Sequence, residues 1–412
     1  MRRIFLFCLF ILYGCTSSTQ IHLDTLQDNF SHGDFESATK NFSSNIEPEK
    51  QSNLELLING ITLFHENKFT ESDSFFEEFN KRNLSSTDSS ISREAVGLLF
   101  GQTVNSYKPY MMDLLFVSYY QLWDLLAMGN IDTARVVINQ SYNRQQEMSI
   151  EYKKLISERK QDITPELQEI IGKNSADWIM FNDIMNPALM YLSGIYFLTN
   201  DDFENAVTYL KRASGMVPDN TFIKHDLELA EKHIKPKHTA WIFSETGFAP
   251  RLQEQHAGLF LPNVGMIYFS FSEPRFSQSS IKPQQSQLLA NVDAMFMTEY
   301  NEYRTNEILR SYTNAVSKAT LQATMYNSHS NSAPLLGILS SIYTVASSDT
   351  EIRTWATLPQ YIYVNRIDTS KSSLNDFNID DIVKFGIKSD NNKLIYLRLT
   401  PNIIDSKVIN LK

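Results

Sequence analysis

Residues Pro187–Pro218 read PALMYLSGIYFLTNDDFENAVTYLKRASGMVP, and this stretch decides the predicted fold. An apolar run, a short acidic turn and an amphipathic run that closes on a proline predict two antiparallel helices. Gly194 would stand where the two helices come closest, and Leu210 would fill the groove between them. Ala206 and Ala213 would let the second helix pack close to the first. The stretch therefore predicts one helical hairpin.

The same arrangement recurs along the N-terminal half of the chain. Two further candidate units begin near Thr19 and Asn53, 34 residues apart, and another begins near Leu115. This spacing resembles the period of the tetratricopeptide repeat, a helical unit that stacks into a binding scaffold. Each unit lacks the consensus tryptophan, so a general array of helical hairpins is the alternative. Both interpretations predict an α-solenoid over residues 21–237.

The N-terminus predicts a signal peptide and a lipid anchor. Two arginines precede the apolar run Ile4–Tyr13, which is too short to span a bilayer. The next residues complete Leu12–Cys15 (LYGC), which resembles the lipobox of bacterial lipoproteins. We therefore predict a signal peptide at 1–14 and a lipidated spacer at 15–20, with stable attachment through acylated Cys15. A secretory signal with an incidental cysteine is the alternative.

Other features bear on location and partners. Thr16 follows the cysteine, and by resemblance to Gram-negative lipoproteins this implies the outer membrane, on its periplasmic face. The net charge of −10 argues against nucleic acid and anionic membrane surfaces as partners. The sequence has two cysteines, Cys8 in the signal peptide and Cys15, so the mature chain would have no thiol for a disulfide or a metal site.

The composition changes after the breaker Lys235–Lys237. Short aromatic and β-branched runs bounded by glycine and proline predict strands, while Asp293–Tyr326 predicts one or two long helices. We therefore expect an α+β protein, in which the helical domain is followed by a smaller mixed domain at 238–412. The predicted strands lie at 241–243, 259–261, 266–271, 361–364 and 394–399.

Two motifs in the second domain resemble the signatures of one family. Trp241–Pro250 (WIFSETGFAP), followed by Leu261–Pro262, resembles "yEnGfaP…lP", and Asp349–Pro359 (DTEIRTWATLP) resembles "aDxRsWxtLP". Tyr107–Gln140 resembles the helical-repeat core of the same family. These are uncharacterised Gram-negative lipoproteins with tetratricopeptide-like repeats. The resemblance implies a fold and an envelope location, but it implies no reaction.

The sequence carries no motif of an established enzyme class. It lacks H-E-x-x-H, G-x-S-x-G, the P-loop and G-x-G-x-x-G, and its eight histidines are scattered. Glu245 and Glu254 could form a carboxylate pair for glycan hydrolysis, although a turn cap is the preferred interpretation of Glu245. We therefore predict no enzyme, no cofactor and no metal site.

The two motifs supply the candidate partner-binding residues, and several of these also have structural interpretations. Gly247 would provide a positive φ after a strand, and Trp355 would anchor the core. Arg353 would share one face of an extended strand with Trp355. The full candidate set is Glu245, Gly247, Pro250, Arg353, Trp355 and Pro359.

Three functions are compatible with these features. The leading hypothesis is a lipid-anchored periplasmic scaffold that holds a protein partner during envelope assembly. The alternative is a module that binds glycan or peptidoglycan through Tyr268, Trp355 and Tyr361. The third is an enzyme of unrecognised type. An open concave groove lined by Tyr and Asn would favour the first, an aromatic-floored cleft in the C-terminal domain the second, and convergent buried carboxylates or histidines the third.

Overall fold

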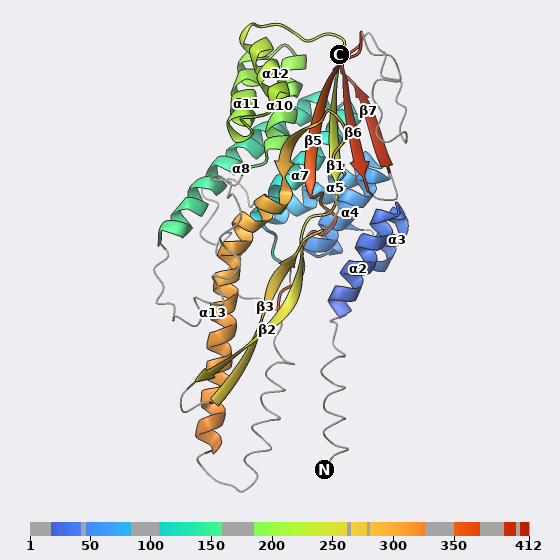
Figure 1. Cartoon of the computed structure of the whole chain (residues 1–412). Coiled ribbons are helices and arrows are strands. Elements are labelled where there is room, and N and C mark those ends of the chain that lie inside the picture. The colour runs from blue at the N-terminus through green and yellow to red at the C-terminus, as the bar shows by residue number, and fades with distance from the viewer. Residues whose placement is uncertain are drawn as a thin grey trace.

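The chain is an α+β protein, with helices in its N-terminal part and a sheet in its C-terminal part (Figure 1). Several predictions lie outside the described residues: the signal peptide, Cys15, a return helix after Pro165 and a helix at 335–346. The computed structural model describes residues 18–42, 47–83, 107–158, 185–261, 265–277, 281–326, 350–370, 391–400 and 404–411.

Within these residues, most helices form four antiparallel pairs. The units predicted from Thr19, Asn53, Leu115 and Pro187 each coincide with one pair. The charged stretch at about Gln145–Asp177, with both signs interspersed, predicts a lengthened second helix in the third pair, and that helix runs to Glu158. The pairs are α2 (Ser18–Ser31) with α3 (Phe35–Phe42), α4 (Asn53–His65) with α5 (Phe69–Asn83), α7 (Met111–Ala127) with α8 (Ile131–Glu158), and α10 (Pro187–Thr199) with α11 (Phe203–Met216); α12 (Thr221–Glu231) follows.

The turns inside the four pairs share one backbone geometry. The residue that leaves the first helix has a positive φ in each: 71° at Gly33, 62° at Asn67, 70° at Gly129 and 61° at Asp201. The next amide donates to the carbonyl five residues earlier over 2.8–3.0 Å, which closes the helix end as a Schellman motif. The same Schellman turn therefore joins the two helices of each pair.

Close helix contact at a glycine recurs in two pairs. A Cβ on Gly194 would lie 2.6 Å from Leu210 Cδ2, and a Cβ on Gly60 would lie 2.5 Å from Phe76 Cε1. These separations are far below van der Waals contact, so any larger residue would force the facing side chain to shift. The prediction that Gly194 marks the closest approach, with Leu210 in the groove, is confirmed.

The main sheet is mixed and has its most buried strand in the centre. Every residue of β1 (Thr239–Thr246) is buried. It pairs antiparallel with β5 (Tyr361–Asp368) and parallel with β6 (Lys393–Leu399). The five-stranded order is β4-β5-β1-β6-β7, with β4 (Gln287–Asn291) and β7 (Ile404–Asn410) at the edges.

The helices and the sheet share one core. Trp241 and Phe243 of β1 belong to a cluster of buried side chains that extends back to α2. The Trp123 ring of α7 lies 5.5 Å from the rings of both Phe243 and Tyr396. The proposed division into domains at 237/238 is a prediction, and side chains on either side of it are in contact throughout this core.

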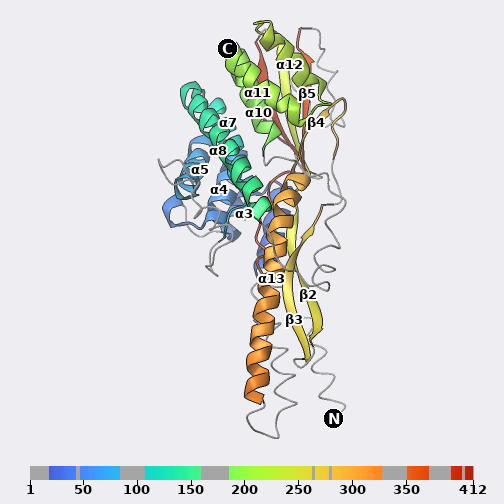
Figure 2. The same ribbon diagram turned by 90° about the vertical axis from the view of Figure 1, so that its left-hand side faces the viewer.

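A second substructure, which we call the arm, projects away from the body (Figures 1 and 2). It consists of the hairpin β2 (Arg251–Leu261) and β3 (Gly265–Arg275) with helix α13 (Val292–Tyr326). The inward side chains of β3 pack against α13 in a small core of their own. One continuous helix of 35 residues, about 52 Å long, fulfils the helical prediction. Strand β3 runs to Arg275, beyond the predicted 271.

Candidate functional site

The two motifs that resemble a family signature lie side by side. The Ala249 amide donates to the Leu358 carbonyl (2.8 Å), and the Gln360 amide donates to the Thr246 carbonyl (2.9 Å). These bonds extend the β1–β5 pairing past the end of β1. The motifs, about a hundred residues apart in sequence, therefore form one local structure at the end of the sheet.

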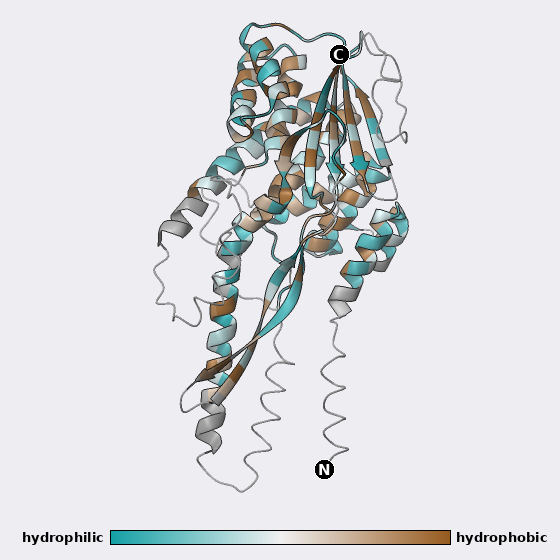
Figure 3. Ribbon diagram, in the orientation of Figure 1, coloured by the Kyte–Doolittle hydropathy of each residue, from teal (hydrophilic) through white to brown (hydrophobic). Residues whose placement is uncertain are grey.

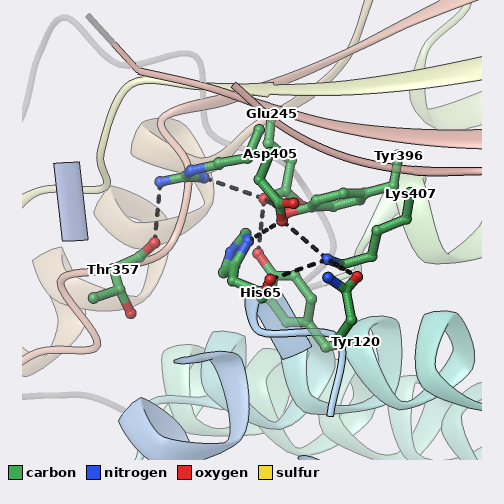
Figure 4. A network of polar contacts seen from close by, with 9 residues as sticks. His65, Tyr120, Glu245, Thr357, Tyr396, Asp405 and Lys407 are labelled. Atoms are coloured by element: carbon green, nitrogen blue, oxygen red, sulfur yellow. Dashed lines mark hydrogen bonds and ion pairs between the residues drawn. The ribbon is translucent and has the colours of Figure 1, made fainter. Parts of the chain in front are cut away.

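Glu245 is the centre of a polar network in this region (Figure 4). Its Oε2 accepts hydrogen bonds from Tyr120 of α7 (2.9 Å) and Tyr396 of β6 (2.7 Å). Arg398 of β6 adds an ion pair to the same oxygen at 3.1 Å. Both charged side chains are enclosed, with exposed fractions of 0% for Glu245 and 1% for Arg398. The network joins a helix to two neighbouring strands.

Arg398 also holds the two motifs together. Its Nη2 donates to the carbonyls of Gly247 (3.0 Å) and Thr357 (3.1 Å), one from each motif. Its guanidinium lies over the Phe248 ring, 5.1 Å from the centroid. A planar, permanently charged group with several donors suits these simultaneous contacts, which a lysine could not reproduce.

The pKa shifts in the network indicate which groups donate hydrogen bonds and which accept them. Burial raises the pKa of Glu245, while Arg398 and the two tyrosine hydroxyls oppose that rise by stabilising the carboxylate. Burial also raises the pKa values of Tyr120 and Tyr396 well above their usual range. The tyrosines therefore stay protonated and act as donors.

A second set of contacts joins α4 to β7. His65 Nδ1 lies 2.6 Å from Asp405 Oδ2, and Lys407 Nζ lies 3.0 Å from the same oxygen. Lys407 also donates to Asn67 Oδ1 (2.9 Å) in the turn after α4. Burial lowers the pKa of His65 to about 4, so at neutral pH the ring is uncharged and donates Nδ1–H to Asp405.

Both sets of contacts, which we call the seam, lie between helices and sheet. Carboxylates and a histidine converge here, as we would expect of an enzyme. However, Glu245 and His65 are fully enclosed, and their partners are side chains of the same chain. A substrate would have no access, so these contacts favour a structural role. No group of metal-ligating side chains is found in the described part of the chain.

The candidate residues of the first motif all lie in the interior. Glu245, Gly247 and Pro250 are buried. Gly247 has φ = 63°, as its sequence context predicts. The carbonyl of Pro250 faces the hydroxyl of Thr354 in the second motif, at 3.5 Å. The first motif therefore presents none of these side chains to a partner at the surface.

The second motif divides between core and surface. Trp355 is buried with its ring 6.0 Å from that of Tyr120, and Pro359 is buried nearby. Arg353 is half-buried and pairs with Glu351. The prediction that Arg353 and Trp355 share a strand face is wrong, because residues 351–355 form no strand. The Glu351 carboxylate instead accepts from the Arg353 amide (3.0 Å), which removes that amide from strand pairing.

Sequence analysis missed Arg398 and its tyrosine partners. A signal for Arg398 was present, since it interrupts the apolar strand KLIYLRL just as Glu245 interrupts the apolar strand TAWIFSET. A charge within a buried strand requires a buried partner. Two opposite charges in two such strands therefore indicate a pair. No comparable signal marks Tyr120 among the many aromatics of α7.

The aromatic residues named for glycan binding do not lie together. Tyr268 is on the arm, Trp355 is in the core, and Tyr361 begins β5. Glu254, the second carboxylate of the hydrolytic alternative, accepts a hydrogen bond from Thr350 (3.1 Å) at the base of the arm. These placements give the glycan hypotheses no common site.

An exposed row of side chains on α8, which we call the α8 stripe, is apolar at its two ends and polar between them. Its members recur at alternating spacings of four and three residues, which is the spacing of a helix–helix seam. Beside it, Arg212 lies 4.4 Å over the Tyr142 ring, and that ring lies 5.3 Å from the Tyr209 ring. The stripe comprises Val136, Gln140, Asn143, Glu147 and Ile150.

Comparison with known proteins finds no matching family model, curated protein or solved structure. Among the helices that the structure describes, none has the length and apolar character needed to cross a bilayer. Function is therefore inferred from the sequence motifs, the fold and the contacts alone.

Proposed function

We propose that this protein is a lipid-anchored scaffold on the periplasmic face of the outer membrane, where it binds a protein partner during envelope assembly. Its helical pairs would stack as a tetratricopeptide-like solenoid and offer one extended surface. The observation that carries the proposal is the α8 stripe, with Val136 and Ile150 exposed at its ends and polar side chains between them.

The chemistry of the α8 stripe suits a helical partner. A second helix could bury the two apolar ends and hydrogen-bond the central Gln140 and Asn143, which would set its register. The adjacent Arg212 and Tyr142 belong to residue types that often carry interface energy. These properties support a protein partner over a glycan, which would require a platform of exposed aromatic rings.

The anchor rests on the lipobox and on the start of the fold. Helix α2 begins at Ser18, three positions after Cys15. An acylated cysteine would hold the body within about 11 Å of the bilayer surface at the extension limit of the chain. Cys15→Ala should abolish acyl labelling and leave an uncleaved or soluble precursor, whereas normal processing and membrane fractionation of that variant would contradict the anchor.

Site-specific photo-crosslinking in living cells tests the partner surface. A photoreactive amino acid at Asn143 should give a discrete crosslinked product, and the same amino acid at exposed Lys224 of α12 should give none. Changing Val136→Asp together with Ile150→Asp should remove the product without lowering protein abundance. Equal crosslinking from positions 143 and 224, or a product that survives the double change, would contradict the proposal.

A further inference from the structure

The arm extends in the direction from which the lipid anchor would enter. Figure 1 shows the hairpin and the distal half of α13 projecting toward the side on which α2 begins. An ion pair joins Asp24 of α2 to Arg251 at the start of β2, so these two residues lie at one level. From that level, β2 runs away from the body. The N-terminal end of α2 points in the same direction (Figure 1).

The lengths of these two paths differ. Ten residue steps along β2 from Arg251 to Leu261 span about 33 Å. From Asp24 back to Ser18 the helix spans about 9 Å, and the chain from Ser18 to Cys15 adds at most about 11 Å. The hairpin therefore reaches about 13 Å farther than the fully extended anchor can.

Helix α13 reaches at least as far as the hairpin, and its direction is fixed by the body. Near its start, Glu299 accepts from the amides of Met111 (2.7 Å) and Met112 (3.2 Å) at the N-terminus of α7. Farther along, Glu307 accepts from the Ser272 hydroxyl (2.6 Å) close to the base of the hairpin. About 28 Å of helix continues from there to Tyr326.

The part of the arm beyond the anchor level is apolar. Figure 3 shows the hairpin changing from hydrophilic at its base to hydrophobic at its tip. On its outer face Phe260 is 69% exposed, Met266 49% and Tyr268 38%. The first two pair across the strands, and Tyr268 pairs with Gly258. Since these side chains lie on the face opposite the small core with α13, that core leaves them uncovered.

Charge along the arm follows the same boundary. No Asp, Glu, Lys or Arg occurs from Gln255 to Ser272 in the hairpin, and none occurs from Ala319 to Tyr326 at the end of α13. Between Glu307 and Ala319 the only charged residues are Arg310 and Lys318, both basic and both exposed. The net charge of −10 thus resides elsewhere, and the distal arm is locally positive.

We propose that the tip of the arm inserts into the same phospholipid leaflet that holds the acyl chains of Cys15. The apolar outer face would enter the acyl boundary, at the depth of about 5–10 Å typical of interfacial elements. Arg310 and Lys318 would then lie near the anionic phosphates. The inference rests on the proposed lipid anchor, and it adds a second attachment that would fix the orientation of the body on the membrane.

A fluorescent probe at the tip tests this insertion. Acylation blocks Cys15, and Cys8 leaves with the signal peptide, so Phe260→Cys would supply the sole free thiol. The full mature lipoprotein, labelled there with the environment-sensitive fluorophore NBD, would be reconstituted into vesicles of equal parts phosphatidylethanolamine and phosphatidylglycerol. Ile234→Cys, 48% exposed near α12 at the far end of the body, is the matched control.

We expect the probe at position 260 to shift its emission to the blue and to be quenched by nitroxide groups on lipid acyl chains. The control at 234 should remain quenchable by aqueous iodide alone. A probe at 260 that is as accessible to iodide as the control would overturn the inference. Shielding from iodide without quenching by lipid would also overturn it, because a protein would then cover the tip.

The mass of the labelled protein separates this inference from the proposed anchor. A diacylated or triacylated mass with a water-exposed tip would overturn insertion and leave the anchor in place. An unacylated mass would overturn the anchor, and the length comparison behind the inference would fail with it. In an unacylated chain that begins at position 15 with Cys15→Ser, and so lacks the apolar run Ile4–Tyr13, Phe260→Asp with Met266→Asp should reduce binding to these vesicles at least about tenfold, whereas Ile234→Asp should not.

Discussion

The seam buries charged side chains, whereas the arm exposes apolar ones. In the seam, Glu245 and Arg398 are enclosed within the core, and each is matched by several partners from separate elements. On the arm, Phe260 and Met266 face solvent. A buried charge is tolerated where its partners compensate for lost hydration. An exposed apolar cluster remains in contact with water because no side chain that the structure describes covers it. Such a cluster indicates a binding site for a protein or a membrane. The seam thus stabilises the fold, whereas the tip of the arm is suited to contact with an apolar phase outside the molecule.

The largest effect on stability should come from breaking the seam. Arg398→Met would leave the Glu245 carboxylate buried without its cation and should lower the free energy of unfolding by about 3–5 kcal/mol. Arg353→Met, which removes a half-buried ion pair with Glu351, should cost about 1 kcal/mol or less. Urea denaturation measures both. Similar losses of unfolding free energy in the two variants would mean that the buried ion pair of the seam stabilises the fold no more than the half-buried pair does.

The free energy of unfolding should depend on pH through His65, the histidine of the seam. The pKa of His65 is about 4 in the folded chain and 6.5 ordinarily, so between these pH values the unfolded chain binds a proton that the folded chain does not. The contribution of neutral His65 to the free energy of unfolding is therefore complete above pH 6.5 and is lost as pH falls toward 4. Between about pH 7 and pH 4.5 the loss should be about 2–3 kcal/mol.

Other buried groups titrate in the same range, so the difference between the natural chain and His65→Gln isolates this contribution. Glutamine can still donate to Asp405 but takes up no proton. Urea denaturation of both chains at the two pH values should show a smaller acid loss in the variant. Parallel losses would place the acid sensitivity elsewhere.

A matched pair of glycine substitutions compares body and arm more finely. Gly194→Leu would press on Leu210 between two packed helices and should cost about 1–3 kcal/mol. Gly258→Leu would meet the ring of Tyr268 at 3.1 Å, and that half-exposed ring can move aside, so the cost should stay below about 1 kcal/mol. Thermal unfolding measures both. The reverse order would mean that the arm is packed more tightly than the helical pairs.

The smallest effect on stability should come from the tip of the arm. Phe260→Asp with Met266→Asp replaces exposed side chains and should change the free energy of unfolding by no more than about 0.5 kcal/mol per site. The same variant should lose its contact with lipid vesicles. A large loss of stability would show that the outer face of the hairpin belongs to the fold and would remove the contrast with the seam.

Sequence alone predicted those parts of the fold that depend on neighbouring residues. The hairpin of Gly194 and Leu210 could be predicted because its turn, close contact and closing proline lie within one repeat. The order of the sheet could not, because β1 pairs with strands that begin more than a hundred residues later. Of the candidate residues, Gly247 has the predicted backbone and Trp355 the predicted burial. The strand expected at Arg353 is absent, and the Arg353 amide donates to the Glu351 carboxylate.

The contact between His65 and Asp405 also constrains the order in which the chain can mature. The two residues are 340 positions apart, so α4 meets its last partner only when β7 is present. A chain that crosses a membrane from its N-terminus would release the helical pairs first and the closing strand almost last. Until then His65 of α4 would lack its partner Asp405. A chain that ends before β7 would lack Asp405 and Lys407, so we expect α4 and the turn after it to lose these contacts while β1 and β6 still cover Trp123 of α7.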